Sequence, residues 1–216
     1  YVIVPGIVNA NVDLNGDGYT ADTNETGGGV YQNRDPFISV FNSAGTFQWS
    51  TRLGGVADDF GYGVAVDSNN NVIVAGYVYG NADLNGDADT ADSNETSGGV
   101  YQAIDGFLSV FNSAGTFQWS KRLGGTSNDK IFSVTADSNK NVIVAGDVFR
   151  NGDLNGDGDT ADANETGSTG VYGSFDAFIS VFNSAGTFIW SERLGGTGAD
   201  EIHHVVVDNN NNIRVT

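Results

Sequence analysis

The sequence contains no cysteine among its 216 residues, so no disulfide bond and no thiolate metal site can form. It has no methionine and only two prolines. No apolar run approaches the ~18 residues of a membrane-spanning helix, so we expect no membrane span. The chain opens on "YVIVPG", which is already strand-like, with no basic and apolar leader before it. We interpret the chain as a processed protein or as a segment of a longer one.

Basic residues are also scarce. Nine Lys and Arg stand against 27 Asp and Glu, which gives a formal net charge of -18. Because this charge repels phosphates, we expect no nucleic acid as a partner. About half of the acidic residues fall in three short stretches. Carboxylates packed this closely repel one another unless a cation offsets them, so the stretches are candidates for cation binding.

The three acidic stretches mark three tandem repeats of about 70 residues. "DLNGDGYTADTNET" begins at Asp13, "DLNGDADTADSNET" at Asp83 and "DLNGDGDTADANET" at Asp153. A second segment, "VFNSAGTF", is identical in all three copies. We divide the chain into blade repeats at residues 1–70, 71–140 and 141–211, with 212–216 as the start of a fourth repeat or a swapped strand.

Each repeat reads as four short strands, which in the middle copy fall at residues 71–78, 105–112, 116–123 and 130–137. Val, Ile, Phe and Trp fill these segments, while Gly, Asn, Asp and Ser fill the breaks. The segments are apolar on both faces: Val72 and Val74 alternate with Ile73 and Ala75, so both faces of each sheet should be covered. The pattern predicts an all-β fold of three tandem four-stranded β-propeller-type blades, in a partial propeller or a β-solenoid-like array.

A family resemblance lies between the acidic stretches. The segment from Asp35 to Gly76, "DPFISVFNSAGTFQWSTRLGGVADDFGYGVAVDSNNNVIVAG", resembles the bacterial β-propeller repeat of the SBBP type. The resemblance implies a propeller-type blade and an exported bacterial or archaeal protein, often in a surface or adhesive assembly, and it implies no catalytic residues. The chain departs from the family in its inserted acidic loops and in having three units, where a closed ring needs at least about four.

Each acidic stretch has the spacing of a calcium loop of the EF-hand or dockerin type. Such loops take oxygen ligands from positions 1, 3 and 5, with glycine at 6, a backbone carbonyl at 7 and an acidic side chain near 12. In the third copy Asp153, Asn155 and Asp157 hold positions 1, 3 and 5, followed by Gly158 and Asp159. Calcium tolerates irregular oxygen geometry, whereas magnesium needs a tighter octahedron. The spacing therefore predicts about one calcium ion per repeat.

The closing acid of the loop is displaced. Position 12 holds Asn164, while Asp162 stands at 10 and Glu165 at 13; we favour Asp162 as the later ligand, with Glu165 beside it. In the second copy Ala88 replaces the glycine of position 6, which predicts a strained or weaker site. An Asx-rich solvated turn is the simpler alternative. The predicted ligands are Asp13, Asn15, Asp17, Tyr19, Asp22, Glu25, Asp83, Asn85, Asp87, Asp89, Asp92, Glu95, Asp153, Asn155, Asp157, Asp159, Asp162 and Glu165.

The same stretches end in "NET", an Asn-x-Thr acceptor for N-glycosylation. One duplication event explains all three, so they carry less weight than the acidic spacing. The candidate glycosylation sites are Asn24, Asn94 and Asn164.

Other recurring residues suit structural roles. We expect one tryptophan per repeat to pack between blades, with stacking on sugars as the alternative. Two aspartates per repeat are expected to hydrogen-bond turn amides, and one arginine to pair with those turn acids. The sets are Trp49, Trp119 and Trp190; Asp59, Asp129 and Asp200; Asp67, Asp137 and Asp208; and Arg52, Arg122 and Arg193.

Nothing in the sequence points to catalysis. His203 and His204 occur in one repeat only and face opposite ways on a strand, so they cannot easily share a metal. No nucleophile with a histidine partner recurs, and near-identical repeats offer little of the asymmetry that a catalytic site needs. A propeller glycosidase is therefore the least favoured function.

The sequence predicts a non-catalytic, extracellular, calcium-stabilised structural protein of a bacterial or archaeal cell surface. Both chain ends are strand-like, and an unpaired edge invites strand addition from a neighbour. The expected partner is therefore the chain itself, in a filament or array assembled head-to-tail. The alternative is an adhesin, or a carbohydrate- or protein-binding propeller module, with surface glycans as partners.

Overall fold

The computed structural model describes residues 2–22, 25–162, 164–167 and 171–216. These residues form strands and turns and contain no helix, which confirms the predicted all-β class. The strands are β1 Val2–Asn9, β2 Arg34–Phe41, β3 Phe47–Arg52, β4 Gly54–Gly55, β5 Phe60–Val66, β6 Val72–Tyr79, β7 Ala82–Asp83, β8 Ile104–Phe111, β9 Phe117–Gly125, β10 Lys130–Ala136, β11 Val142–Phe149, β12 Gly152–Asp153, β13 Phe175–Phe182, β14 Phe188–Leu194, β15 Val205–Val207 and β16 Ile213–Val215.

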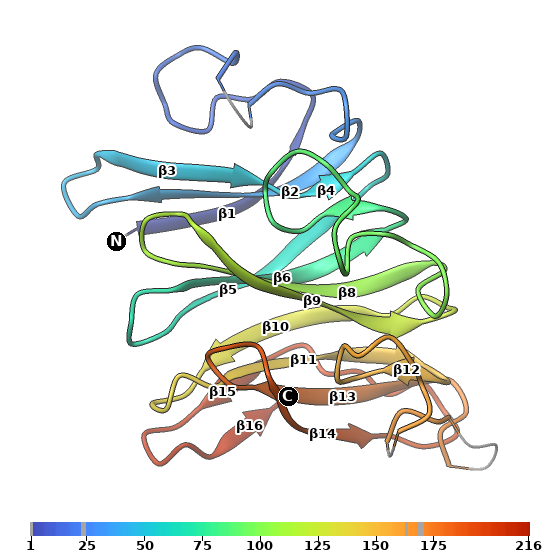
Figure 1. The fold of residues 1–216 in the computed structure, drawn as a ribbon. Coiled ribbons are helices and arrows are strands. Elements are labelled where there is room, and N and C mark those ends of the chain that lie inside the picture. The colour runs from blue at the N-terminus through green and yellow to red at the C-terminus, as the bar shows by residue number, and fades with distance from the viewer. Residues whose placement is uncertain (1, 23–24, 163, 168–170) are drawn as a thin grey trace.

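Antiparallel sheets are stacked in chain order, from β1–β3 to β15–β16 (Figure 1). One sheet has the order β5-β6-β8-β9, extended by the short β12, and the next has the order β10-β11-β13-β14. The four strands expected in the middle repeat all form, within two residues of their predicted ends. The sheets are offset from the sequence repeats, because β10 closes the middle repeat in sequence yet pairs with β11 of the next. This offset ties neighbouring repeats together.

Both faces of the inner sheets are buried, as the strand pattern predicted. Val72 and Val74 of β6 face the preceding sheet, where they join a cluster with Ile38 and Val40 of β2. Ile73, on the opposite face of β6, joins a cluster shared with β11 and β13 of the following sheet. Since hydrophobic contact runs continuously from sheet to sheet, each repeat depends on its neighbours for burial.

The first strands of successive sheets lie side by side, β5 beside β10 and β10 beside β15. A bulge displaces Tyr62 in β5 and Phe132 in β10 from the regular ladder. The Tyr62 ring lies 5.7 Å from the Phe132 ring, which lies 5.5 Å from the ring of His203. These three equivalent residues form a continuous ring contact along the stack.

Two of the three recurring tryptophans, Trp49 and Trp119, pack between repeats as predicted, whereas Trp190 is 40% exposed. Trp49 Nε1 donates a hydrogen bond to the Ser113 carbonyl of the next repeat at 3.1 Å. Trp119 makes the same bond to the Ser184 carbonyl at 3.0 Å. Gly115 lies so close to the Trp49 ring that a Cβ there would come within 2.7 Å of it. The conserved turn sequence "NSAG" therefore serves as a platform for the indole of the preceding repeat.

The arginine prediction was wrong in its partner. Arg52 pairs with Asp35 of β2 at 2.7 Å, and both side chains are fully buried. The turn acid Asp59 instead accepts hydrogen bonds from the amides of Gly55 and Tyr79, as its predicted role requires. Arg52 of β3 is paired across the sheet with Phe37 of β2. Asp35 lies two residues before Phe37 on the same strand, which places it within reach of the Arg52 side chain.

Candidate functional site

The base of each acidic loop is fixed by two buried side chains of its own. In the second loop Leu84 is fully buried, and its amide donates to Oε1 of Glu95 at 3.0 Å. The backbone of Ala82 donates to the carbonyl of Glu95 at 3.0 Å, which closes the loop. Ser109 of β8 donates its hydroxyl to the Leu84 carbonyl at 2.7 Å. The loop is therefore anchored to its own sheet at both ends.

The turn within the loop is built from backbone amides that donate to the loop's own carboxylates. Asp83 accepts three such bonds, from Asn85 and Gly86 on Oδ1 and from Ala88 on Oδ2. Asn85 Oδ1 then accepts from the amide of Asp87 at 2.8 Å. The third loop makes the equivalent bonds, and most of them recur in the first. The Asp-Asn-Asp spacing thus specifies a local fold before any ligand is considered.

The side chains of loop positions 3, 5 and 10 converge on the outer side of this turn. In the second loop Asn85 Nδ2 lies 3.2 Å from Oδ2 of Asp87 and 2.9 Å from Oδ2 of Asp92. In the third loop Asn155 lies 3.1 Å from Asp157 and 2.9 Å from Asp162. The first loop brings Asn15 and Asp22 to 3.0 Å. Two carboxylates and one amide therefore meet in the second and third loops, and position 10 lies beside position 3 in all three.

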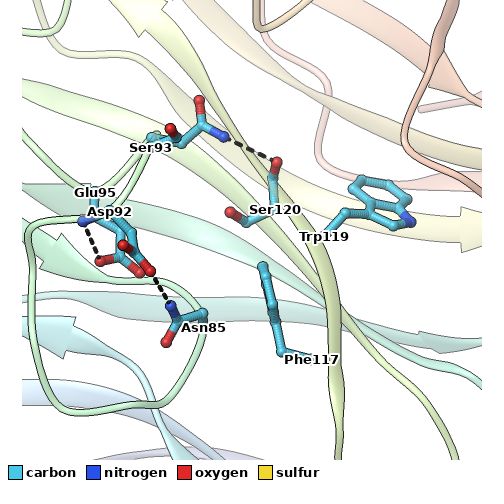
Figure 2. A pocket seen from close by; sticks show the side chains of 8 residues that line it. Asn85, Asp92, Ser93, Glu95, Phe117, Trp119 and Ser120 are labelled. Atoms are coloured by element: carbon cyan, nitrogen blue, oxygen red, sulfur yellow. Dashed lines mark hydrogen bonds between the residues drawn. The ribbon is translucent and has the colours of Figure 1, made fainter.

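A hollow opens beside this convergence, between the loop and the outer strand of its own repeat. Figure 2 shows Asn85 and Asp92 on one side of the hollow and Phe117, Trp119 and Ser120 of β9 on the other. Its volume is about 350 Å³. An equivalent hollow of about 260 Å³ recurs in the third repeat, lined by Asn155, Asp162, Glu165, Phe188 and Ser191.

The glutamate at loop position 13 occupies a different environment from the converging acids. Glu95 is 1% exposed, and its Oε2 faces the Asp92 amide at 3.3 Å. Burial raises the pKa of Glu95 to about 7, against hydrogen bonds from the Leu84 and Asp92 amides. Glu165 has the same surroundings, and its pKa is also raised to about 7. The glutamate therefore closes the base of the loop by accepting hydrogen bonds from backbone amides.

The second loop is docked on the preceding repeat through its first aspartate. Tyr31 donates its hydroxyl to Oδ2 of Asp83 at 2.5 Å and also lies 2.9 Å from the Arg52 carbonyl. The Arg52 guanidinium lies over the Tyr31 ring, 5.0 Å from its centroid. Burial and the neighbouring Asp83 carboxylate raise the pKa of Tyr31, so the hydroxyl stays protonated and donates. Asp83 is fully buried in this contact.

The third loop repeats this docking. Tyr101 bonds to Oδ2 of Asp153 at 2.5 Å and to the Arg122 carbonyl at 2.9 Å. Lys121 adds a bond from Nζ to the Gly156 carbonyl at 3.0 Å. Sequence reasoning missed the tyrosines, although their signal was present: Tyr31, Tyr101 and Tyr172 recur once per repeat.

The remaining predicted site residues are distributed around the loop. Tyr19 is 72% exposed and donates its amide to Asp17. Asp89 and Asp159 accept bonds from the amides of Ala91 and Ala161 on the solvent side. Among the described residues, no group of three or more His, Cys, Asp or Glu side chains is arranged to hold a metal ion. Each candidate set is instead a mixture of two aspartates with an asparagine.

Of the sequon asparagines, Asn94 lines the hollow of the second repeat, and Asn164 bonds to Ser191, which lines the hollow of the third. Asn94 donates Nδ2 to the Ser120 carbonyl at 3.2 Å, and Asn164 donates to the Ser191 carbonyl at 3.0 Å. Both have a left-handed backbone with φ of 70°. Asn24 lies outside the described residues. A glycan would be attached at the nitrogen that makes these bonds.

Comparison with known proteins supports the repeat class. Residues 48–81 match the family model of the SBBP β-propeller repeat. The chain is 27% identical over 186 residues to an uncharacterized WD repeat-containing protein, L264, of Acanthamoeba polyphaga mimivirus, covering 78% of this chain and 13% of that protein. It is 27% identical over 180 residues to the regulatory protein FlaEY of Caulobacter vibrioides, covering 81% of this chain and 17% of that protein.

The fold and the matches together define an all-β protein of tandem repeats that contains a β-propeller repeat. The chain spans less than a fifth of the length of either relative. The described part of the chain has no helix with the length and apolarity needed to cross a membrane.

Proposed function

We propose that this chain is a non-catalytic, extracellular structural protein of β-propeller-type repeats in which each acidic loop binds calcium. The observation that carries this proposal is the docking of Asp83 on Tyr31 and of Asp153 on Tyr101. The leading aspartate of each docked loop thereby accepts bonds from the turn of its own loop and also contacts the preceding repeat. An ion that orders the loop would therefore also hold neighbouring repeats together.

Calcium suits the chemistry of the converging side chains. The Asp87 and Asp92 carboxylates share a single donor, Asn85 Nδ2. A calcium ion at that point would satisfy both carboxylates more fully than one amide does, because it takes six to eight oxygens in irregular geometry. The Asn85 oxygen and a backbone carbonyl at position 7 are the further donors expected. The glutamate at position 13 is not one of these donors, because its oxygens accept hydrogen bonds from backbone amides at the base of the loop.

The calcium proposal predicts a large stability effect. With calcium about tenfold over its dissociation constant, each site adds roughly 1.4 kcal/mol, so three sites add about 4 kcal/mol. Thermal unfolding should therefore shift to lower temperature when the protein is treated with excess EDTA, and calcium but not magnesium should restore it. Calorimetric titration of the EDTA-treated protein would give the number of sites.

Paired variants test which loop residues are involved. Asp92→Asn and Asp162→Asn remove a proposed ligand, and we expect each to reduce the calorimetric stoichiometry by one. Asp89→Asn, which changes an exposed acid on the solvent side of the loop, is the matched control for charge and should leave the stoichiometry intact. An unchanged melting curve in EDTA would remove calcium from the proposal and leave the loops as solvated Asx turns.

Head-to-tail assembly is the second part of the proposal. In β1, Val2 is 53% and Val4 is 41% exposed, whereas their equivalents in β6, Val72 and Val74, are buried. Another repeat, from the same chain or from a second copy, would cover this face by blade stacking or strand addition. Light scattering of the chain over a wide concentration range tests self-assembly, and a compact monomer throughout would argue against a filament of this chain.

A binding module is the second candidate, favoured by a hollow between the second and third repeats. The hollow has a volume of about 270 Å³ and is lined by Phe149, Phe175, Ser127 and Asn128. The two rings meet edge to face at 5.0 Å. Half-buried rings beside hydroxyl and amide groups suit the apolar face and hydroxyls of a sugar.

A glycan array distinguishes this candidate from a purely structural protein. We expect Phe149→Ala to abolish any glycan signal. Tyr79→Ala, at the equivalent position of the preceding repeat, is the control that should retain it. A signal unaffected by Phe149→Ala would assign binding to another surface.

A further inference from the structure

Two buried aspartates meet at each of the first two sheet junctions, apart from the acidic loops. Asp35 lies in β2, and Asp59 lies in the turn between β4 and β5; both are fully buried. Their equivalents in the next repeat are Asp105, which is fully buried, and Asp129, which is 1% exposed. Buried carboxylates are rare in proteins unless each one is paired.

A glycine stands where one oxygen from each member of the pair converges. A Cβ atom on Gly54 would lie 2.5 Å from Oδ1 of Asp35 and 2.9 Å from Oδ2 of Asp59. A Cβ atom on Gly124 would lie 2.7 Å from Oδ1 of Asp105 and 3.0 Å from Oδ2 of Asp129. Oxygens from both members of a pair thus surround one point, and only glycine leaves that point open.

Hydrogen bonds account for the other oxygens of the pair but leave this contact short of a donor. Arg52 donates to Oδ2 of Asp35 from Nε and Nη2 at 3.2 and 2.7 Å. Asp59 accepts from the Tyr79 amide on Oδ1 and from the Gly55 amide on Oδ2. Within the described part of the chain, Asp35 Oδ1 accepts no hydrogen bond. The Gly55 amide, which also lowers the pKa of Asp35, donates to Asp59 at this point and leaves Asp35 Oδ1 without a hydrogen bond from the described residues.

The second pair shows the same deficit on both sides. Asp105 is bonded to Arg122 through Oδ2, at 3.1 Å from Nε and 2.9 Å from Nη2, and Asp129 Oδ1 accepts from the Phe149 amide at 2.6 Å. In the described residues neither Asp105 Oδ1 nor Asp129 Oδ2 has a hydrogen-bond partner. The nearby Gly125 amide lowers the pKa of both acids, but neither of these two buried oxygens has a hydrogen bond of its own in the described part of the chain.

The charge of each pair is also unbalanced. One arginine faces two carboxylates, which leaves one uncompensated negative charge in a buried site. The other ionisable groups nearby are mostly acidic, because Asp58 lies near the first pair and Asp147 and Asp153 lie near the second. Arg122 also acts on the first pair and lowers the pKa of Asp59, although its ion pair is with Asp105. Tyr31 and Tyr101 approach from the loop side as neutral hydroxyls already committed to Asp83 and Asp153.

We propose that each of these two junctions binds one proton, shared between Asp35 and Asp59 in the first and between Asp105 and Asp129 in the second. In the first pair the proton sits on Oδ1 of Asp35, and the resulting hydroxyl donates to Oδ2 of Asp59. The arginine then balances the one remaining carboxylate, and the missing donor is supplied. Two carboxyl groups in contact ionise as a coupled unit, so the proton belongs to the pair.

The electrostatics of the site support this assignment. Burial raises the pKa of Asp35, Asp59 and Asp105 to about 7, and it also raises that of Asp129. Since the folded pKa lies above the unfolded value near 4, the folded state binds the proton more tightly. The resulting stability is complete below about pH 4 and is lost as the pH rises through about 7.

The third repeat provides an internal control. Asp176 is buried against Arg193 at 2.8 Å, as in the other repeats. Its potential partner Asp200, however, is exposed to solvent. A Cβ on Gly195 would meet Asp176 but no oxygen of Asp200 among its nearest atoms. In the described residues Asp176 Oδ1 also lacks a hydrogen-bond partner, so the third junction shares the unsatisfied oxygen and the arginine pair but not the second buried carboxyl group.

The test compares thermal unfolding of the full chain at pH 5 and pH 8, in EDTA so that calcium does not contribute. Asparagine at position 35 or 105 mimics the protonated acid, because its NH₂ group supplies the missing donor. We expect the wild-type melting temperature to fall by roughly 5 °C between these pH values. The double variant Asp35→Asn, Asp105→Asn should lose much of that fall, whereas Asp176→Asn should retain it. The change in melting temperature with pH must be compared between wild type and variants, because Glu95 and Glu165 also titrate in this range.

Carboxyl-carbon NMR of the wild-type chain provides a second readout that needs no variant. We expect one aspartate carboxyl group of each pair to remain protonated at pH 6. The Asp147 resonance is assigned separately, because burial raises the pKa of Asp147 to about 6. A wild-type slope equal to that of the double variant, or fully ionised aspartates at pH 6, would overturn the proposal. A melting temperature that depends on metal concentration and not on pH would do the same, since it would assign the gap to a cation.

Discussion

The first acidic loop and the two that follow have nearly the same sequence but different surroundings. In the first loop the amides of Gly16 and Gly18 donate to Asp13, just as Gly156 and Gly158 donate to Asp153. Asp13 is nevertheless exposed, whereas Asp153 is fully buried against Tyr101. The turn is therefore encoded within the loop, and its burial is contributed by the repeat before it.

The pKa of the leading aspartate reflects this difference. Bonds from the Gly18 and Gly16 amides lower the pKa of Asp13. In the later loops burial raises the pKa of Asp83 and Asp153, even though the tyrosine and similar amide bonds act in the opposite direction. One sequence thus yields acids of different strength. A repeated motif should be interpreted together with the surface on which it docks.

Removing the leading carboxylate should have the largest effect, and only in the docked loops. Asp83→Asn leaves one acceptor oxygen where Asp83 now accepts three amide bonds and a tyrosine hydroxyl. We expect a loss of about 3 kcal/mol in the free energy of unfolding, because buried donors are left unsatisfied. Urea denaturation of Asp83→Asn and Asp13→Asn provides the measurement.

Asp13→Asn is the matched control, since water can replace the lost acceptor in the exposed loop. We expect a clearly smaller loss for this variant. Equal losses in the two variants would mean that the turn alone matters and that docking adds nothing to stability.

Removing the tyrosine hydroxyl isolates the contribution of the preceding repeat. Tyr31→Phe keeps the ring under Arg52 but deletes the bonds to the Arg52 carbonyl and Asp83. We expect a loss of about 1–2 kcal/mol by urea denaturation. The pKa of Asp83 should also rise further, because the hydroxyl bond lowers it; carboxyl-carbon NMR measures that change.

Tyr172→Phe is the control for this deletion. Tyr172 bonds to the Arg193 carbonyl at 3.2 Å, and in the described chain that is its one hydrogen bond. The Tyr172→Phe variant should lose less free energy of unfolding than the Tyr31→Phe variant. If both variants lose the same stability, the bond to Asp83 contributes nothing measurable.

Most of the fold could be predicted from the sequence, because its signals are local. Alternating apolar residues such as Val72 and Ile73 indicated strands covered on both faces, and both residues are buried in different clusters. The identical turn sequences fixed the repeat. The offset of sheets from repeats was not predicted, because the residues of β10 and β11 do not by themselves specify that these two strands pair.

For the candidate site, the sequence indicated the contacts within each loop but not the contacts between repeats. The spacing of Asn85, Asp87 and Asp92 indicated their convergence, which depends on turn geometry within a few residues. The contact of Tyr31 with Asp83 spans 52 positions and needs the stacking of whole repeats. The partner of Arg52 was misassigned for the same reason, because both candidate acids recur with the same period.

The smallest expected effect concerns position 6 of the loop, where the second copy differs. Ala88 adopts a left-handed backbone with φ of 68°, close to the 87° and 91° of the equivalent Gly18 and Gly158. This conformation is unfavourable for alanine and free for glycine. Ala88→Gly should therefore stabilise the chain by up to about 1 kcal/mol and should tighten calcium binding at the second loop if the ion is bound there.

Gly158→Ala makes the reciprocal change in the third loop. A Cβ at Gly158 would meet no atom within 4 Å, so any loss is conformational and not steric. We expect a loss of similar size to the gain from Ala88→Gly, measured by the same urea titration. If the two substitutions shift stability in the same direction, the second loop is not strained by its alanine, and the three loops differ only in how they dock on the preceding repeat.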